Sequence, residues 1–101
     1  MNKIENISLV IMEECAEVQQ AISKCLRFGY DCYNPQFPNT NNGKDVLKEY
    51  FQLQAMMELL MEESGLKNYM TEKEIAETKK HKIEKFLEYQ NRSIELEKVQ
   101  E

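Results

Sequence analysis

The sequence predicts an all-α protein, and three observations agree on this. Proline and glycine are scarce, with 2 and 3 residues among 101. Good helix formers, chiefly Glu, Lys, Leu, Met and Gln, dominate the stretches between them. Apolar residues in these stretches recur every three or four positions, as in helices that bury one face. We therefore expect one domain over residues 1–101, with two long helices and a C-terminal helix, whose small core oligomerisation would complete.

The first helix is expected to begin near Asn2 or Lys3, because Asn2 and Glu5 can form a capping pair. It should end at Phe28, with Gly29 as a left-handed cap. Its apolar stripe, taken at about 100° per residue, consists of Ile7, Val10, Ile11, Val18, Ala21, Cys25 and Phe28. The 3 cysteines lack CxxC spacing and a nearby His. Cys15 and Cys25 are therefore interpreted as small packed side chains.

Two acids interrupt this stripe. Glu14 and Glu17 fall inside it, and Glu13 lies at its edge. Taking an ionised carboxylate out of water is costly, so two of them one turn apart need a counter-charge. A bound divalent cation, Mg²⁺ or alternatively Mn²⁺, would supply that charge. The alternative is that this end of the stripe faces solvent and that the acids are simply hydrated.

Residues 30–43, YDCYNPQFPNTNNG, are expected to form a loop because Asn and Pro replace the helix formers. Ordered loops of this length are often functional. Its aromatic residues Tyr30, Tyr33 and Phe37 could stack on a nucleobase, or they could cover the end of the helical bundle.

The second helix is expected from about residue 44 to 64, with Asn41 or Asn42 as its cap and Gly65 after its end. Between residues 46 and 61 it is apolar nearly all round. Such a helix should be buried on most sides, which in so small a chain implies contact with another subunit. A third acid, Glu49, lies near the centre of the face that is formed by Val46, Leu53, Met56 and Leu60.

The third helix should open with a capping box made by Thr71 and Glu74. It has a thin apolar stripe: Ile75, Ala76, Ile83, Phe86, Leu87 and Ile94. Beyond about Asn91 the polar tail is expected to fray. A local basic patch contains Lys79, Lys80, His81, Lys82 and Lys85. Solvated surface charge explains this patch without a ligand role for His81.

The charge and hydropathy of the chain exclude several partners. A net charge of −5 argues against a nucleic-acid polymer, because contacts to a phosphate backbone need clustered Lys and Arg. No apolar run approaches the roughly 20 residues that cross a bilayer, so no membrane contact is expected. The N-terminus lacks a basic segment followed by an apolar one, and we expect a cytoplasmic protein.

The stretch EECAEVQQAISKCLRFG, followed by TNN and VLKEYFQLQAMMELL, resembles the MazG-like all-α nucleoside triphosphate pyrophosphohydrolases. The hallmark of that family is ExxE on one helix and ExxD on the next. ECAE at 14–17 matches the first motif, and EYFQ at 49–52 matches the second except that Gln replaces Asp. The resemblance covers about residues 8–62. HKIEKF at 81–86 is similar to a segment on the closing helix of small phage-type members.

The resemblance implies metal-dependent hydrolysis of a nucleoside triphosphate to the monophosphate and pyrophosphate. It implies that Glu14, Glu17 and Glu49 are catalytic acids that hold Mg²⁺, with Gln52 at the position of a further ligand. Because Gln52 brings no charge, Glu13 could compensate for it as a ligand. By the same resemblance, the residues that contact the nucleotide would be Lys24, Arg27, Asn41, Asn42, Lys82 and Lys85. Because the second helix is too apolar to be left exposed, we expect a homodimer or a tetramer that is a dimer of dimers. The short length and the Lys-bearing third helix suggest a phage or prophage protein, which would act in the host cytoplasm.

Each of the residues assigned to nucleotide contact also has an alternative interpretation without a role in function. Lys24 and Arg27 could be surface charge, and Asn41 and Asn42 could be loop caps. Because Gln52 brings no charge to a metal site, a second class of function is a protein that binds and sequesters a nucleotide without cleaving it. An acidic helical interaction module would fit the same bundle.

Overall fold

The computed structural model describes the backbone of residues 1–100 and the side chains of residues 1–92. It contains the helices α1 (Lys3–Phe28), α2 (Asn42–Ser64) and α3 (Glu72–Gln100), and a short 3₁₀ helix, η1 (Leu66–Asn68). No strand occurs in this part of the chain, so the all-α prediction is confirmed. The chain divides into two compact units, Met1–Lys67 and Asn68–Glu101. Among the described residues, none of the helices combines the length and the hydropathy that a membrane span requires.

Both ends of α1 follow from local signals. The Asn2 side chain accepts a hydrogen bond from the Glu5 backbone N–H at 2.8 Å, and the Glu5 carboxylate accepts one from the Asn2 N–H at 3.3 Å. This is the predicted capping box. At the other end, the Gly29 N–H donates to the Cys25 carbonyl at 2.7 Å. Gly29 is the C-cap of α1 with a positive φ of 96°, as predicted, but its ψ of 149° lies outside the left-handed helical region, so the chain leaves α1 in an extended direction.

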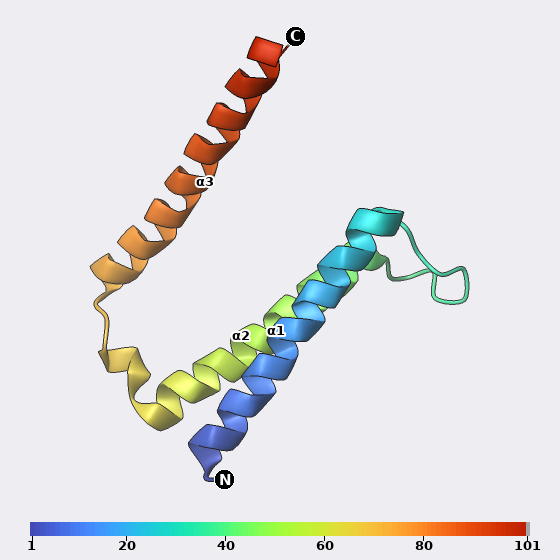
Figure 1. The fold of residues 1–101 in the computed structure, drawn as a ribbon. Helices are drawn as coiled ribbons and strands as arrows, with labels where there is room; N and C mark the ends of the chain where they lie inside the picture. Colours follow the sequence, from blue (N-terminus) through green and yellow to red (C-terminus); the bar gives the residue numbers. More distant parts are fainter. Residues whose placement is uncertain (101) are drawn as a thin grey trace. The chain divides into compact units, whose positions relative to one another are not determined.

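The helices α1 and α2 pack antiparallel, side by side (Figure 1). Ile7 and Cys25 of α1 are buried, and the rest of the contact is half-buried, with Val10, Ile11, Val18 and Ala21 on α1 and Val46, Leu53, Met56 and Leu60 on α2. An exposed ion pair of 2.9 Å joins Lys3 to Glu63, so the start of α1 lies beside the end of α2.

Two members of the expected α1 core are instead exposed. Phe28 is 61% exposed, because it is the last residue of α1 and lies at the end of the contact with α2. Cys15 is exposed as well, because it lies about 100° round the helix from Glu14, outside the contact stripe. Only Cys25 of the two cysteines is a packed side chain.

The helix α2 begins two residues earlier than expected, at Asn42. The reason is that Asn41 is the cap, with its side chain accepting from the Lys44 N–H at 2.8 Å. It ends at Ser64, and Gly65 is left-handed as predicted, with a φ of 78°. Only the face toward α1 is half-buried, so the expected burial on most sides does not occur within Met1–Lys67.

The loop between α1 and α2 is tied to both helices. The Asn42 N–H donates to the Cys32 carbonyl at 2.9 Å, and the Gly43 N–H donates to the Tyr30 carbonyl at 2.8 Å. A Cβ at position 43 would lie 3.2 Å from that carbonyl oxygen, which explains the glycine. The loop aromatics are more than half exposed, so they do not cover the end of the helix pair: Tyr30, Tyr33 and Phe37.

The second unit consists mainly of α3. The Thr71 hydroxyl accepts from the Glu74 N–H at 3.1 Å, and the Glu74 carboxylate accepts from the Thr71 N–H at 3.3 Å, which confirms the predicted capping box. The backbone stays helical to Gln100, where fraying was expected beyond Asn91. The described members of its apolar stripe are exposed: Ile75, Ala76, Ile83, Phe86 and Leu87. Ile94 lies outside the described side chains.

Candidate functional site

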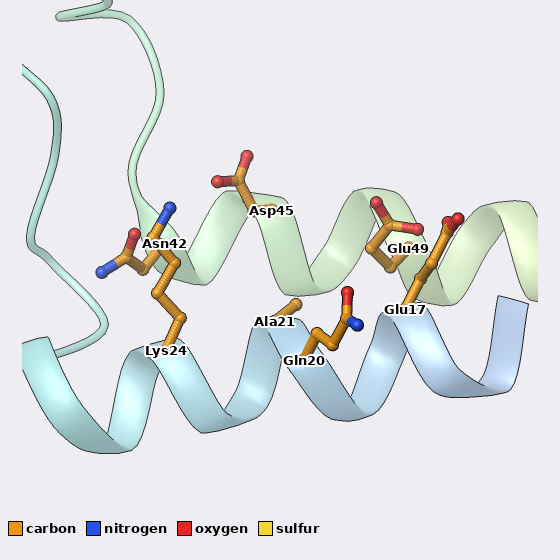
Figure 2. Close-up of a pocket in the computed structure, with 7 residues that line it drawn as sticks. All are labelled: Glu17, Gln20, Ala21, Lys24, Asn42, Asp45 and Glu49. Atoms are coloured by element: carbon orange, nitrogen blue, oxygen red, sulfur yellow. The ribbon is translucent and has the colours of Figure 1, made fainter.

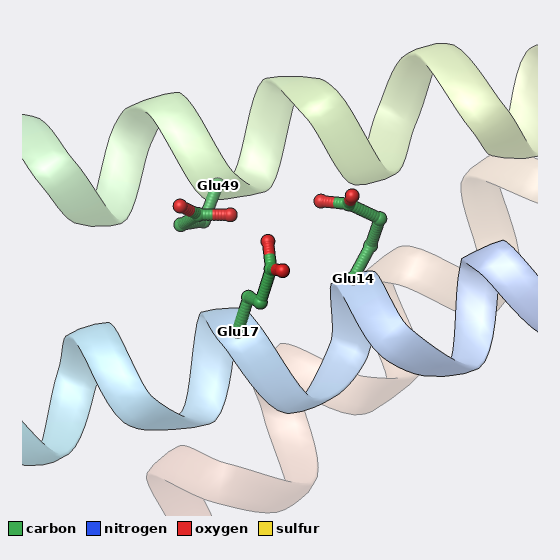
Figure 3. A group of neighbouring side chains, drawn as sticks. All are labelled: Glu14, Glu17 and Glu49. Atoms are coloured by element: carbon green, nitrogen blue, oxygen red, sulfur yellow. The ribbon is translucent and has the colours of Figure 1, made fainter.

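Three carboxylates meet between α1 and α2. Glu14 and Glu17 project from successive turns of α1 toward Glu49 on α2 (Figure 3). One oxygen of each carboxylate lies within 4.8 Å of the others. The antiparallel packing therefore brings together the acids of the ECAE and EYFQ motifs, which are far apart in the sequence.

This cluster places like charges where water is partly excluded. Glu14 and Glu49 are half-buried, and their Oε2 atoms are buried without a hydrogen-bond partner. Burial raises the pKa of Glu14 above its ordinary value of 4.5, and the Glu17 and Glu13 carboxylates raise it further. The pKa of Glu49 is raised first by the hydrogen bond that its protonated carboxyl can share with Glu17, and then by burial and neighbouring acids.

The donor set fits a hard divalent cation. Carboxylate oxygens are the ligands that Mg²⁺ and Mn²⁺ accept, and a cation at this point would satisfy the two buried oxygens that have no partner. Glu17 is exposed and open to hydration, whereas Glu14 and Glu49 each have one oxygen that is buried.

An open groove of about 370 Å³ continues from the cluster along the two helices (Figure 2). Glu17 and Glu49 lie at one end of it, and Lys24 extends toward Asn42 at the other. The groove is lined by Glu17, Gln20, Ala21, Lys24, Asn42, Asp45 and Glu49. It can therefore offer carboxylates to a cation at one end and an ammonium group to an anion at the other.

The two asparagines have structural tasks. Asn41 caps α2, which agrees with the alternative that this residue is a cap and not a nucleotide contact. Asn42 is 6% exposed, and its side-chain Nδ2 donates to the Gly29 carbonyl at 3.1 Å. Of the two, Asn42 alone is among the residues that line the groove.

Several residues that the resemblance assigned to the site lie elsewhere. Arg27 lines a separate hollow together with Ser23, and its guanidinium carbon lies 5.5 Å from the centre of the Phe28 ring. Gln52 is exposed and lines a hollow on another part of the α2 surface, beside Lys48 and Phe51. Neither Arg27 nor Gln52 is among the residues that line the groove.

The other assigned residues are also exposed. Glu13 lies outside the set of three converging carboxylates and acts on it through its charge, which raises the pKa of Glu14. Lys82 and Lys85 are exposed residues of α3, in the unit Asn68–Glu101.

Sequence reasoning missed two polar residues of the groove, Gln20 and Asp45. The Thr40 hydroxyl donates to Asp45 at 3.4 Å, and the Asp45 charge contributes to the raised pKa of Glu49. A signal was present, because Gln20 follows Glu17 by three positions and Asp45 precedes Glu49 by four. These spacings place residues on the same side of a helix.

The site is thus defined by its own residues: three converging acids, a groove and a lysine at its far end. Comparisons of the chain with protein-family models, with curated proteins and with solved structures find no match.

Proposed function

We propose that this chain is a Mg²⁺-dependent nucleoside triphosphate pyrophosphohydrolase of the MazG-like type, which converts a ribo- or deoxyribonucleoside triphosphate to the monophosphate and pyrophosphate. The observation that carries the proposal is the convergence of Glu14, Glu17 and Glu49, with two buried oxygens that lack a partner. The reaction class comes from the resemblance of ECAE, EYFQ and the intervening segment to that family. In this proposal the protein acts as a homodimer or tetramer.

The residues of the groove support this assignment by their chemistry. When bound, Mg²⁺ would neutralise phosphate charge and lower the pKa of a coordinated water. Lys24, at the other end of the groove, would contact phosphate oxygens as a compact positive charge. Gln20 and Asn42 also line the groove, Gln20 between its two ends and Asn42 beside Lys24, and each brings an amide group to it. Exposed Glu17 can accept a proton from a water molecule in the groove.

One observation favours the second candidate, a protein that binds a nucleotide and does not cleave it. Position 52 carries a neutral amide where the family that the chain resembles has an Asp, and Gln52 lines a hollow other than the groove. The site then has three carboxylates to hold a cation, which suffices for binding one Mg²⁺ because that ion usually keeps several waters.

A panel of ribo- and deoxyribonucleoside triphosphates tests both candidates. Incubation with Mg²⁺ or Mn²⁺ should release pyrophosphate from at least one of them, and Glu49→Gln should abolish the release. Glu77→Gln, which removes the same charge from the exposed surface of α3, serves as the control. Binding without release for every triphosphate would establish the sequestering protein instead. Absence of any nucleotide binding would eliminate both.

A further inference from the structure

The side of α2 that points away from α1 is not covered by any other helix of the unit Met1–Lys67. It carries a line of residues alternately four and three positions apart, which we call the α2 seam: Lys44, Lys48, Phe51, Ala55, Glu58 and Glu62. Leu47 and Leu59 flank it. Leu47, Phe51 and Leu59 are 56%, 58% and 39% exposed. Two open hollows, of about 680 and 460 Å³, lie along this side of α2 and share Ala55 in their walls.

The α2 seam has the spacing of the contact positions in a coiled coil. Its first half carries positive charges, and its second half carries negative charges at the same distances from the centre. Lys48 lies five residues before Leu53, and Glu58 lies five after it. Lys44 and Glu62 are likewise nine residues before and after Leu53. Nearest the centre, the large Phe51 and the small Ala55 are two residues away on either side. Two copies of the α2 seam placed antiparallel are therefore complementary in charge and in side-chain size.

We propose that the α2 seam is a docking surface for the α2 seam of a second copy of this chain. The two helices would be antiparallel, and the two-fold axis would pass between them at the level of Leu53, whose own side chain lies on the opposite face of α2, toward α1. In such a pair every contact occurs twice, because the same surface is used by both copies. Lys48 then faces the partner's Glu58, and Phe51 fills the hollow beside the partner's Ala55. This inference rests on the homo-oligomer of the proposed function, for which it assigns the interface, and it does not depend on the proposed hydrolysis.

The existing contacts of these side chains identify the pair that sets the register. Lys48 has no ion-pair partner among the described side chains, and the Glu58 carboxylate accepts only a 3.3 Å bond from the Gln54 amide. By contrast, the Lys44 Nζ donates to the Asn39 carbonyl at 3.3 Å, and Glu62 is paired with Lys67 at 2.7 Å. Lys48 and Glu58 are thus available to a partner, whereas Lys44 and Glu62 are already engaged.

Charge also selects the antiparallel orientation. In a parallel, in-register pair each Lys48 would face the partner's Lys48, and each Glu58 would face the partner's Glu58. Like charges that face each other across helices are destabilising. Only the reversed orientation pairs the basic half of α2 with the acidic half of its copy.

The same geometry gives a reason for the amide at position 52. Gln52 flanks the α2 seam one residue from its centre, so the two copies of Gln52 come together beside the two-fold axis. Two amides can donate and accept hydrogen bonds across the axis, whereas two carboxylates would repel.

Charge exchange in the full-length protein tests the proposal by sedimentation equilibrium. The wild type should dimerise at micromolar concentration. Lys48→Glu and Glu58→Lys should each weaken dimerisation by on the order of tenfold, because each turns two attractive pairs into repulsive ones. The double variant Lys48→Glu/Glu58→Lys should restore dimerisation, because the exchanged charges again face each other. A monomeric wild type, single variants that dimerise like the wild type, or a double variant without rescue would each overturn the proposal.

Two further measurements test whether dimerisation depends on these particular charge pairs and not on the net charge of the chain. Lys73→Glu makes the same charge change on the exposed surface of α3 and should leave dimerisation unchanged; an equal loss would mean that net charge alone is responsible, and would overturn the proposal. A Lys44→Glu/Lys48→Glu chain mixed with a Glu58→Lys/Glu62→Lys chain should form a heterodimer, although each chain alone stays monomeric. Failure of the mixture to associate, with both chains helical by circular dichroism, would also overturn it.

Discussion

The side-chain Nδ2 of Asn42 donates a 3.1 Å hydrogen bond to the carbonyl of Gly29. The bond joins the residue after the end of α1 to the first residue of α2, and it is partly buried. Because Asn42 also lines the groove, this bond helps to fix the start of α2 relative to Lys24.

Loss of this bond should therefore destabilise the first unit. Asn42→Ala is expected to lower the free energy of unfolding by about 1–3 kcal/mol, since it leaves a partly buried carbonyl without its donor. Asn42→Asp keeps the shape but removes the donor, and it should cost at least as much. Urea unfolding at neutral pH measures both. An Asn42→Asp variant as stable as the wild type would contradict the role of this bond.

The acidic cluster should make stability depend on magnesium. A cation that binds only the folded protein at ten times its Kd stabilises it by about 1.4 kcal/mol. We expect Mg²⁺ to raise the Tm of the wild type and Glu17→Gln to abolish that rise. Glu13→Gln is the matched control, because it removes the same charge from an exposed neighbour outside the cluster. An equal loss in both variants, or a Tm indifferent to Mg²⁺ in the wild type, would show that the cluster holds no metal.

The raised pKa values of Glu14 and Glu49 predict a pH dependence in the presence of a chelator. The folded protein binds protons at these sites more tightly than the unfolded chain does. The stability gained from this protonation is complete below the ordinary pKa of 4.5 and is lost as the pH rises through the raised values. We therefore expect the free energy of unfolding to fall from pH 4.5 toward neutrality, and to fall less in Glu14→Gln. The same slope in both proteins, measured by urea unfolding in EDTA, would contradict this.

Lys24 and Arg27 should differ in nucleotide binding although they are three residues apart. Lys24 lines the groove and Arg27 lines a separate hollow. Lys24→Gln is expected to weaken binding of a non-hydrolysable triphosphate analogue by on the order of tenfold, the loss of a charge-assisted contact. Arg27→Gln, with the same charge change, should have little effect. Calorimetric titration in Mg²⁺ measures both, and a larger loss in Arg27→Gln would place the phosphates outside the groove.

Gln52→Asp tests whether position 52 belongs to the metal site. If Gln52 is a metal ligand, as the resemblance to the MazG-like family implies, this change restores a carboxylate to the site and should raise turnover. From the position of Gln52 beside Lys48 and Phe51, outside the groove, we expect the rise in Tm on adding Mg²⁺ to be unchanged. A clearly larger rise in the variant would show that the side chain reaches the cation.

The sequence by itself determined the helices and most of their ends. The caps at Asn2, Gly65 and Thr71 depend on hydrogen bonds or backbone angles within a few residues, so they can be predicted without knowledge of any tertiary contact. The convergence of Glu14, Glu17 and Glu49 could be predicted from the sequence for a related reason. A helical period places each acid on the apolar face of its helix, and the apolar faces pack against each other.

Only the tertiary structure decided which polar residues share the groove. Periodicity gives an angle round one helix, whereas a groove depends on how far each side chain lies from a second helix. Lys24 and Arg27 differ by three positions, as do Glu49 and Gln52, and in each pair just one lines the groove. The sequence predicted that Gly29 ends α1, but it did not predict the ψ of 149°, which follows the path that the chain takes to bring Asn42 back to Gly29. A contact between distant segments is fixed by their packing, and no local pattern encodes it.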